Sequence, residues 1–367
     1  MKTDAWDLIE AVDSNCNSTG RVKSSPHINQ LQVVRASNSW SSLLLYFSKN
    51  AEASLWAAKV ARSVVSSLSS VQEFNFEERV GTSDCAIWAD VINHPDTGQP
   101  AGYGTRLQRD VESDTTGKFK HLLGIAKPLL PVGHCALITH WIKAMTASEC
   151  VDTIFVITNA LYFEPFQEWA REFPNVKILS DGTKTNEARL GAVACLQLTI
   201  KHFSVEDHVI VVGGDTLFKE DFSLLKFTER FSEAQAKHRD ASLVLCYQCK
   251  EEETSKYGIL EVDEDMRVSC MKEKPQPSET QSRRACPCFY LFSKESLPLL
   301  DVFLDEKKNA PIQERDAPGT FLSWLILRRP VYVQEILGRF DVGNLPSYIE
   351  CDNYFKDRIQ DNNVYLQ

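Results

Sequence analysis

The residues best suited to chemistry lie in a glycine-rich turn at 101–110, AGYGTRLQRD, and in the segment KPLLPV, which begins at Lys127. Glycine adopts positive φ without steric cost and lets a backbone amide approach a phosphate closely. The planar guanidinium of Arg106 suits phosphate oxygens, and the ammonium of Lys127 supplies a second, compact charge. The combination indicates a polyphosphate site, although an ordinary surface turn could carry the same glycines.

Two common phosphate-binding motifs do not fit this turn. In the dinucleotide motif G-x-G-x-x-G the third glycine would fall on Leu107. A P-loop needs a Lys-Ser or Lys-Thr pair, and none follows at the required spacing. The turn must therefore be interpreted together with acidic residues elsewhere in the chain.

Two aspartates follow strand-like segments and are candidate metal ligands. Asp215 comes after the apolar run HVIVV and two glycines, and Asp341 lies in RFDVGNLPSY after VYVQEIL. Ligands of open α/β sheets bind beyond the carboxyl ends of the strands. Mg²⁺ usually takes one or two carboxylates and completes its shell with waters and phosphate oxygens. We predict that Asp215 and Asp341 hold one Mg²⁺; the alternative is that each caps a neighbouring turn or helix.

A second candidate pair, Glu273 and Lys274, follows the predicted strand VSCMK and precedes Pro275. Pro275 ends the strand because proline cannot donate to a sheet ladder. Glu273 could accept hydrogen bonds from sugar hydroxyls, and Lys274 could neutralise a monophosphate. The alternative is a solvated strand end without a ligand.

Composition limits the classes of partner. The chain has 367 residues, of which 43% are hydrophobic, enough for one large α/β domain plus an extension or for two modest domains. Its 40 basic and 50 acidic residues give a net charge of −10, whereas non-specific nucleic-acid binding needs a positive surface. No apolar run approaches the ~20 residues of a membrane helix, and the N-terminus is acidic where a targeting peptide would be basic. We expect a cytoplasmic protein without nucleic-acid or membrane partners.

The eleven cysteines do not suggest a disulfide framework, since their number is odd and they are scattered. Close pairs occur at Cys246/Cys249 and Cys286/Cys288. They could bind zinc, but the strand-like segments SLVLCYQC and CFYLF favour buried reduced thiols.

The alternation of helices and strands predicts an α/β fold. Apolar strands alternating with helices indicate a mostly parallel central sheet that helices cover on both faces. We expect helices at 136–147, 162–173, 186–203 (with Asn186 as N-cap), 221–238 and 345–357, and strands at 153–158, 208–212, 241–247, 258–263, 267–272 and 288–292. Residues 1–95 form an extension that we expect to be partly disordered or helical, with helix-like apolar spacing within 43–69.

Seven segments, in order, resemble the sugar-1-phosphate nucleotidylyltransferases, the pyrophosphorylase group that includes glucose-1-phosphate thymidylyl-, uridylyl- and adenylyltransferases. They are AGYGTRL, KPLLPVG, NEARLGAVACL, VVGGDTLF, YGILEVDED, the strand ending in MKEKP, and RFDVGNLPSYIE. DAPGTFLSWLI also resembles a segment of some prokaryotic members. The resemblance covers roughly residues 100–356. It implies a Rossmann-like nucleotide-diphospho-sugar transferase fold for 96–357, with the extension 1–95 and the tail 358–367 outside it.

The resemblance also implies a reaction and a role for each matched residue. An NTP and a sugar 1-phosphate would give a nucleotide sugar and pyrophosphate by in-line attack on the α-phosphorus, and homo-oligomerisation is compatible with this. Arg106 would contact the nucleotide phosphates, and Lys127 would stabilise charge at the α-phosphate. The nucleotide would be wrapped by the backbone of Ala101, Gly102, Tyr103, Gly104 and Thr105, with Gly191 against the base. Glu273 and Lys274 would bind the sugar and its phosphate, and Asp215 and Asp341 would hold Mg²⁺.

The chain departs from the family pattern before the turn. Family members have an apolar strand there, but residues 93–100 read NHPDTGQP, and two prolines, an Asp and a Gly cannot form a central strand. The nearest apolar run, CAIWADVI at 85–92, ends eight residues before Ala101. Either this run is the expected strand followed by an insertion, or the central strand is missing.

Two further departures concern specificity. Leu190-Gly191-Ala192-Val193 replaces the common Leu-Gly-Thr-Ala, which leaves the base undetermined. Cys288 stands where a glycine commonly lies beside the sugar, so it crowds the pocket or indicates another substrate. The altered positions and the interrupted strand leave an alternative open: a catalytically impaired relative that binds nucleotide or nucleotide sugar and regulates a partner.

Overall fold

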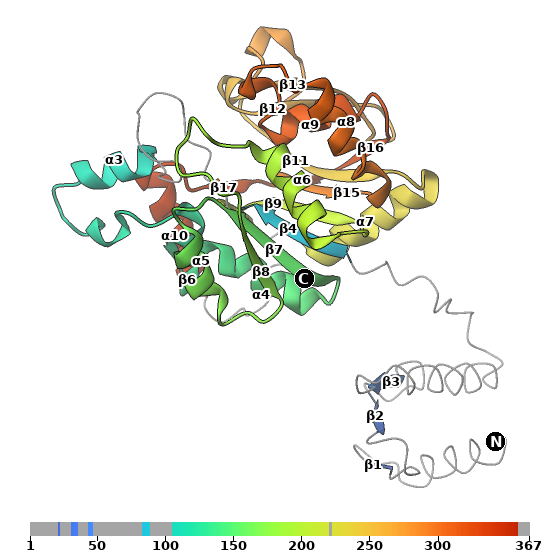
Figure 1. Ribbon diagram of the computed structural model, residues 1–367, viewed down its shortest axis with the longest axis horizontal. Coiled ribbons are helices and arrows are strands. Elements are labelled where there is room, and N and C mark those ends of the chain that lie inside the picture. The colour runs from blue at the N-terminus through green and yellow to red at the C-terminus, as the bar shows by residue number, and fades with distance from the viewer. Residues whose placement is uncertain are drawn as a thin grey trace. The chain divides into compact units, whose positions relative to one another are not determined.

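The computed structural model describes residues 21–22, 31–35, 43–46, 83–88, 105–219 and 222–358 (Figure 1). The chain divides into two units, residues 1–78 and 79–367. In the first unit, β1 (Arg21–Val22), β2 (Leu31–Arg35) and β3 (Leu43–Tyr46) form an antiparallel sheet. The range 43–69 begins with β3, and its helix-like spacing, at Leu55 to Val64, lies outside the described residues.

A ten-stranded mixed sheet, counted over the described residues, forms the centre of the second unit. Its order is β13-β12-β14-β11-β15-β9-β4-β7-β8, with β16 also paired to β11. Its strands are β4 (Ser83–Trp88), β7 (Val151–Thr158), β8 (Val176–Ser180), β9 (Val209–Gly213), β11 (Ser242–Gln248), β12 (Gly258–Val262), β13 (Val268–Glu273), β14 (Arg284–Cys286), β15 (Phe289–Phe292) and β16 (Val331–Ile336). The block β8-β7-β4-β9 and the pair β11–β16 are parallel, and the remaining pairs are antiparallel. This confirms the predicted α/β class and its Rossmann-like core. The parallel pairing that we predicted for most of the sheet is confined to four strand pairs, and five pairs between its described strands are antiparallel.

Strand β4 resolves the two alternatives left by the interrupted segment before the turn. Residues 83–88 pair in parallel with both β7 and β9, in the middle of the parallel block. The apolar run beginning at Cys85 therefore supplies a strand of the parallel block ahead of the turn, and the residues between β4 and α3 lie outside the described residues. This strand lies upstream of residue 96, where we predict the main domain to begin.

Helices cover both faces of the sheet. They are α3 (Thr105–Ser113), α4 (Leu137–Ser148), α5 (Phe163–Ala170), α6 (Ala192–Phe203), α7 (Leu224–Lys237), α8 (Leu299–Glu306), α9 (Pro318–Leu325) and α10 (Leu345–Asp357). Side chains alternate between the two faces along β9: Ile210 and Val212 join the core with α4, α7 and α10, whereas Val209 and Val211 join the core with α6, α8 and α9. A strand buried on both faces must be apolar throughout, which explains the run VIVV at residues 209–212.

The predicted start of one helix is wrong. Helix α6 begins at Ala192, with Gly191 rather than Asn186 at its N-cap position. Gly191 has φ 89° and ψ 158°, a backbone region that is essentially restricted to glycine. The side-chain oxygen of Asn186 instead accepts a hydrogen bond from Arg189 Nη1 at 3.2 Å. A local capping pattern predicted the wrong residue because the true cap comes from a distant segment.

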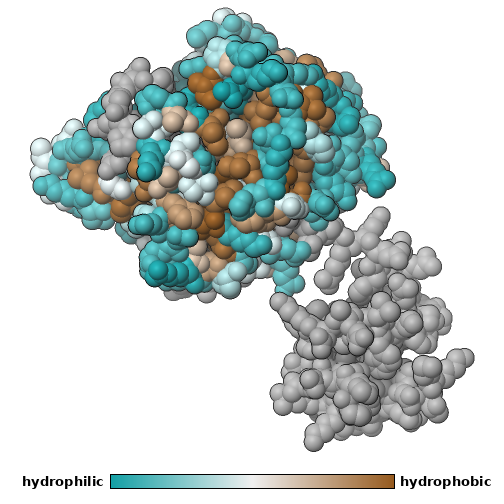
Figure 2. Space-filling view, viewed as in Figure 1, coloured by the Kyte–Doolittle hydropathy of each residue, from teal (hydrophilic) through white to brown (hydrophobic). Residues whose placement is uncertain are grey.

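The surface of the described residues carries both hydrophobic and hydrophilic side chains. The face drawn in Figure 2 carries hydrophobic residues mainly around its centre and hydrophilic residues along its margins. Among the described residues, the most exposed large apolar side chains are Leu327 and Leu337, which follow α9 and β16. None of the described helices is both long and apolar enough to span a membrane.

Candidate active site

The pairing of two short strands brings the two predicted metal ligands together. Strand β10 (Thr216–Phe218) runs antiparallel to β17 (Arg339–Asp341), with Thr216 opposite Asp341. Asp215 immediately precedes β10 and follows the carboxyl end of β9. The side chains of Asp215 and Asp341 are 38% and 43% exposed. Two aspartates from distant segments thus lie at the edge of the sheet where α/β proteins bind ligands.

Lys127 lies next to the first of these carboxylates. Its Nζ is 3.4 Å from Asp215 Oδ2, and its side chain is only 12% exposed. Lys127 begins a short 3-10 turn, Lys127–Leu129, in which Pro128 occupies the first turn and is buried. Burial opposes ionisation of Asp215, but the positive charges of Lys127 and Arg339 outweigh it and hold the pKa of Asp215 below its usual value. The carboxylate is therefore ionised at neutral pH.

Arg339 is a site residue that we did not predict from the sequence. Its Nη2 lies 3.4 Å from Asp341 Oδ2, and its Nη1 lies 3.3 Å from Thr216 Oγ1. Thr216 Oγ1 in turn donates to Asp215 Oδ1 at 3.3 Å. A chain of hydrogen bonds therefore connects the two candidate metal ligands through a guanidinium. The strand period offered a usable signal, because residues 339 and 341 must point to the same side of β17.

Two tyrosines hold that guanidinium in place. Arg339 Nε donates to the hydroxyl of Tyr247 at 3.3 Å, and the guanidinium carbon lies 4.9 Å from the centre of the Tyr257 ring. The side chain of Arg339 is 14% exposed. An arginine with all three nitrogens engaged and an aromatic ring beside it keeps one orientation. It therefore acts as a fixed positive charge beside the carboxylates.

Arg106 lies in the neighbourhood of Asp341. It lies in the first turn of α3, and a Cβ atom built on Gly343 would be 3.6 Å from Arg106 Nη2 and 3.2 Å from Asp341 Oδ1. Glycine at 343 thus leaves room for the guanidinium beside Asp341. Thr105 begins α3, and residues 101–104 of the predicted nucleotide turn lie outside the described residues.

Glu273 and Lys274 form a separate group at the end of β13. Glu273 Oε2 packs against two glycines, since added Cβ atoms at Gly258 and Gly319 would lie 3.1 Å and 3.0 Å from it. Burial raises the pKa of Glu273, and Lys274 partly opposes this. Lys274 has φ 50°, which is uncommon for a residue with a side chain and is enriched at functional sites. Its amide donates to Tyr257 O at 3.0 Å, which holds this conformation.

Cys288, the residue in place of a common glycine, lies near Asp215. Its carbonyl accepts the amide hydrogen of Gly213 at 2.8 Å, and a Cβ atom on Gly213 would lie 3.0 Å from Cys288 Cβ. Burial, together with the charge of Asp215, raises the pKa of the Cys288 thiol to about 12. The thiol is therefore neutral, and Cys288 narrows the space beside Asp215 without adding charge.

The donor set fits a magnesium ion. Mg²⁺ needs only one or two protein carboxylates when substrate phosphates supply further oxygens. Asp215 and Asp341 provide such a pair, and within the described ranges no cluster of three or more His, Cys, Asp or Glu side chains forms a complete protein cage. Lys127, Arg339 and Arg106 stand next to the carboxylates, so phosphate groups would meet positive charge on several sides.

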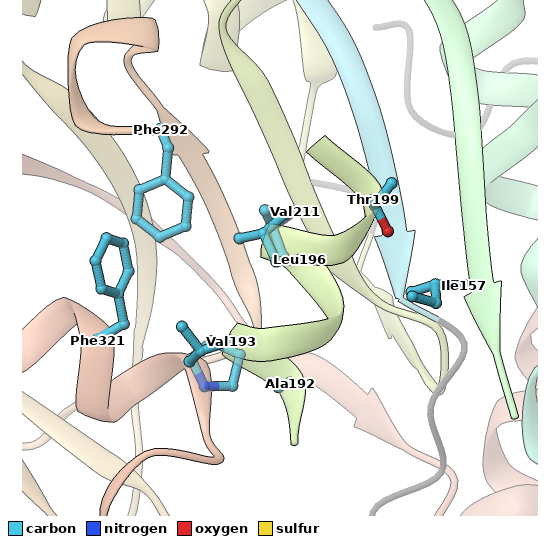
Figure 3. Close-up of a pocket in the computed structure, with 9 residues that line it drawn as sticks. Ile157, Ala192, Val193, Leu196, Thr199, Val211, Phe292 and Phe321 are labelled. Carbon is cyan, nitrogen blue, oxygen red and sulfur yellow. The ribbon is translucent and has the colours of Figure 1, made fainter. Parts of the chain in front are cut away.

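The cavity shown in Figure 3 is not this site. It lies under α6, is lined by apolar side chains including Val193, Val211, Phe292 and Phe321, and measures about 10 Å³. That is room for about one water molecule. A cavity of this size and polarity cannot hold a nucleotide.

Comparison of the sequence with known proteins identifies a family and several relatives. The model of the nucleotidyl transferase family matches residues 123–358. The chain is 26% identical over 170 residues to a glucose-1-phosphate adenylyltransferase of Yersinia pseudotuberculosis serotype O:1b (strain IP 31758), an alignment that covers 44% of this chain and 36% of the relative. A relative of the same name from Yersinia pestis is also 26% identical, with coverages of 44% and 33%. The chain thus spans about a third of the length of these relatives.

Two solved structures share the fold. One is described as a putative glucose-1-phosphate thymidylyltransferase from Bacillus anthracis in complex with a sucrose; its TM-score is 0.55 at 18% identity, over 75% of this chain and 96% of that structure. The other is a UDP-glucose pyrophosphorylase complexed with UDP-glucose, with a TM-score of 0.55 at 17% identity, over 75% of this chain and 99% of that structure. Similarity at this level of identity concerns the fold.

Proposed function

This chain belongs to the nucleotidyl transferase family, and we propose that it joins an NTP to a sugar 1-phosphate to give a nucleotide sugar and pyrophosphate. The observation that carries the proposal is the convergence of Asp215 and Asp341 with Lys127, Arg339 and Arg106 in one place. Such a mixture of fixed carboxylates and cations suits phosphoryl chemistry, in which a polyanion must be bound and a metal ion held.

The reaction is an in-line displacement. A phosphate oxygen of the sugar 1-phosphate forms a bond to the α-phosphorus, while the bond from that phosphorus to the bridging oxygen of the pyrophosphate breaks. The attacking oxygen is already an anion, so no general base is needed. Catalysis then consists of positioning and charge neutralisation. Two unit charges ~4 Å apart repel each other by roughly 4 kcal/mol at an effective dielectric of about 20, and this must be offset.

We assign the residue roles that the family resemblance implies for the matched positions. Arg106 and Lys127 contact the nucleotide phosphates, and Gly191 lies against the base. Glu273 accepts hydrogen bonds from sugar hydroxyls, and Lys274 neutralises the sugar phosphate. Arg339 holds the two aspartates in place. Mg²⁺ bound by Asp215 and Asp341 would supply positive charge for the phosphate oxygens at the reacting phosphorus.

The non-catalytic alternative has lost one of its supports. A missing central strand would have misplaced the phosphate turn, but β4 occupies the centre of the parallel block. The substituted position Cys288 remains, and it bears on which sugar is bound rather than on whether the reaction proceeds. Cytoplasmic location and homo-oligomerisation stay predictions from the sequence.

The test is pyrophosphate release with Mg²⁺ across ATP, CTP, GTP, UTP and dTTP, each combined with several sugar 1-phosphates. We expect turnover for at least one pair and its loss on addition of a chelator. The variant Asp215→Asn should lose turnover and remain folded, because asparagine has the shape of aspartate and keeps an acceptor for Thr216 Oγ1, while the charge that would hold the metal is removed. Asp301→Asn is the matched control: Asp301 pairs with Lys201 at 2.9 Å on the surface, away from the site. Undiminished turnover in Asp215→Asn would refute the metal assignment, and no turnover with any pair would refute the activity.

A further inference from the structure

A single aspartate holds the turn that contains Gly191. Asp316, just before α9 and 8% exposed, accepts the amide hydrogen of Ala192 through Oδ1 at 3.0 Å. Its Oδ2 lies 2.9 Å from Arg189 Nε, and its carbonyl oxygen accepts the amide hydrogen of Val193 at 3.2 Å. One residue thus satisfies two free amides at the start of α6 and pairs with a side chain of the preceding turn. A carboxylate at a helix N-terminus is also favoured by the helix dipole.

The contact between Asp316 and the turn leaves no room for a side chain. A Cβ atom on Gly191 would lie 2.9 Å from Asp316 Oδ1 and 3.0 Å from Asp316 Cα. The close approach explains why glycine is present, in addition to its φ of 89°. The position and shape of the turn are therefore set by Asp316, not by the local sequence.

The segment 316–319 also reaches the Glu273 group. Gly319, in the first turn of α9, lies so close to Glu273 that an added Cβ atom would be 3.0 Å from its Oε2, and the same atom would be 2.8 Å from Met271 Cε. Helix α9 packs firmly on the core: Phe321 and Leu325 are buried, and Phe321 faces Val193 of α6 across the small cavity in Figure 3. Only two residues, at 317 and 318, therefore separate the anchor of the Gly191 turn from the contact with Glu273.

We propose that Asp316 is a positioning residue that couples nucleotide binding to sugar 1-phosphate binding. This inference rests on the proposed function, in which Gly191 lies at the base and Glu273 at the sugar. Asp316 holds the Gly191 turn in its nucleotide-binding shape, and the short segment 316–319, which contacts both groups, transmits a shift of Glu273 to that turn. A sugar phosphate that fixes Glu273 therefore fixes the turn as well, and each ligand favours the other by the same factor.

Binding without turnover tests the coupling. Calorimetry measures the affinity for α,β-methylene analogues of ATP, UTP and dTTP with Mg²⁺, in the absence and presence of glucose 1-phosphate. In wild type, glucose 1-phosphate should tighten binding of one analogue by about 5-fold or more, a usual size for coupling. Asp316→Ala should weaken analogue binding about 10-fold, as expected for loss of charged hydrogen bonds, and abolish the effect of glucose 1-phosphate. Asp316→Asn keeps an acceptor for the Ala192 amide, so its loss should be smaller.

Asp301→Asn is the matched control. Asp301 of α8 pairs with Lys201 near the far end of α6, so this variant also removes an Asp-mediated tie to α6. It should retain wild-type affinity and coupling. Hydrogen exchange at the Ala192 and Val193 amides supplies a readout that needs no ligand: it should accelerate in Asp316→Ala, while the strand amides of β9 stay protected.

Each outcome decides the inference. Unchanged analogue affinity or unchanged coupling in Asp316→Ala would overturn it, and so would unchanged exchange at Ala192 and Val193. Equal losses in Asp301→Asn would also overturn it, because they would reflect a general loosening of α6. Wild-type protein that binds no analogue would instead refute the proposed function itself.

Discussion

Replacing Gly191 by alanine tests the nucleotide turn most directly, because two independent features of the structure oppose a side chain there. The backbone has φ 89° and ψ 158°, and the new Cβ atom would lie 2.9 Å from Asp316 Oδ1. Real Cβ atoms do not come that close to a neighbouring oxygen, and Asp316 is buried and held by three hydrogen bonds. The turn, rather than Asp316, must therefore move.

The size of the effect follows from the backbone strain. Holding a non-glycine residue in this region costs about 1–3 kcal/mol. If the turn relieves that strain by leaving its binding conformation, the competent population falls by about 5- to 150-fold. The apparent dissociation constant for the NTP rises by the same factor, because only the competent fraction binds. The clash with Asp316 adds to this, so the strain alone sets the lower limit.

The assay is calorimetric binding of the α,β-methylene NTP analogues to the Gly191→Ala protein, with the unfolding midpoint measured alongside. Gly182→Ala is the matched control: Gly182 also has positive φ, 78°, but an added Cβ atom meets no other atom within 4 Å. It should lower the unfolding midpoint slightly through its backbone and leave analogue binding unchanged. Wild-type affinity in Gly191→Ala, or an equal loss of affinity in Gly182→Ala, would refute the role of the turn.

Three other predictions concern the remaining site residues. Arg339→Lys should reduce pyrophosphate release by about 10- to 100-fold, the usual effect of losing a residue that orients metal ligands. The reason is that a lysine ammonium cannot bond to Tyr247, Thr216 and Asp341 at the same time. Wild-type turnover in this variant would contradict the prediction. Glu273→Gln should raise the unfolding midpoint at pH 7, because the raised pKa of Glu273 means that its ionised carboxylate destabilises the folded state. The gain in midpoint should vanish below pH 4.5, the ordinary pKa of glutamate, where the unfolded chain is protonated as well. A gain that does not depend on pH would exclude this cause. Cys288→Gly should widen the space beside Asp215 and lower KM for bulkier sugar 1-phosphates; an unchanged sugar profile across the panel would place the sugar elsewhere.

Local sequence patterns predicted most elements of the fold. The run HVIVV gave a strand buried on both faces, and the final helix was predicted at 345–357, as the structure has it in α10. These elements are determined by apolar periodicity and by caps that lie within a few residues, as at Asn344, whose side chain accepts the Ser347 amide at 2.9 Å. The first residue of α6 was predicted wrongly because Asp316, whose carboxylate accepts the Ala192 amide hydrogen, is far away in the sequence.

The sequence alone determined which residues could do chemistry and in what order they occur. Carboxylates that follow apolar strands, and basic side chains beside glycines, can be recognised in a sequence because residue type and strand ends are local properties. Only the tertiary structure decided that β4 lies between β7 and β9 in the parallel block, that Arg339 joins Asp215 to Asp341, and that Asp316 holds the Gly191 turn. These are pairings between distant segments. They depend on strand register and packing, which no local pattern encodes.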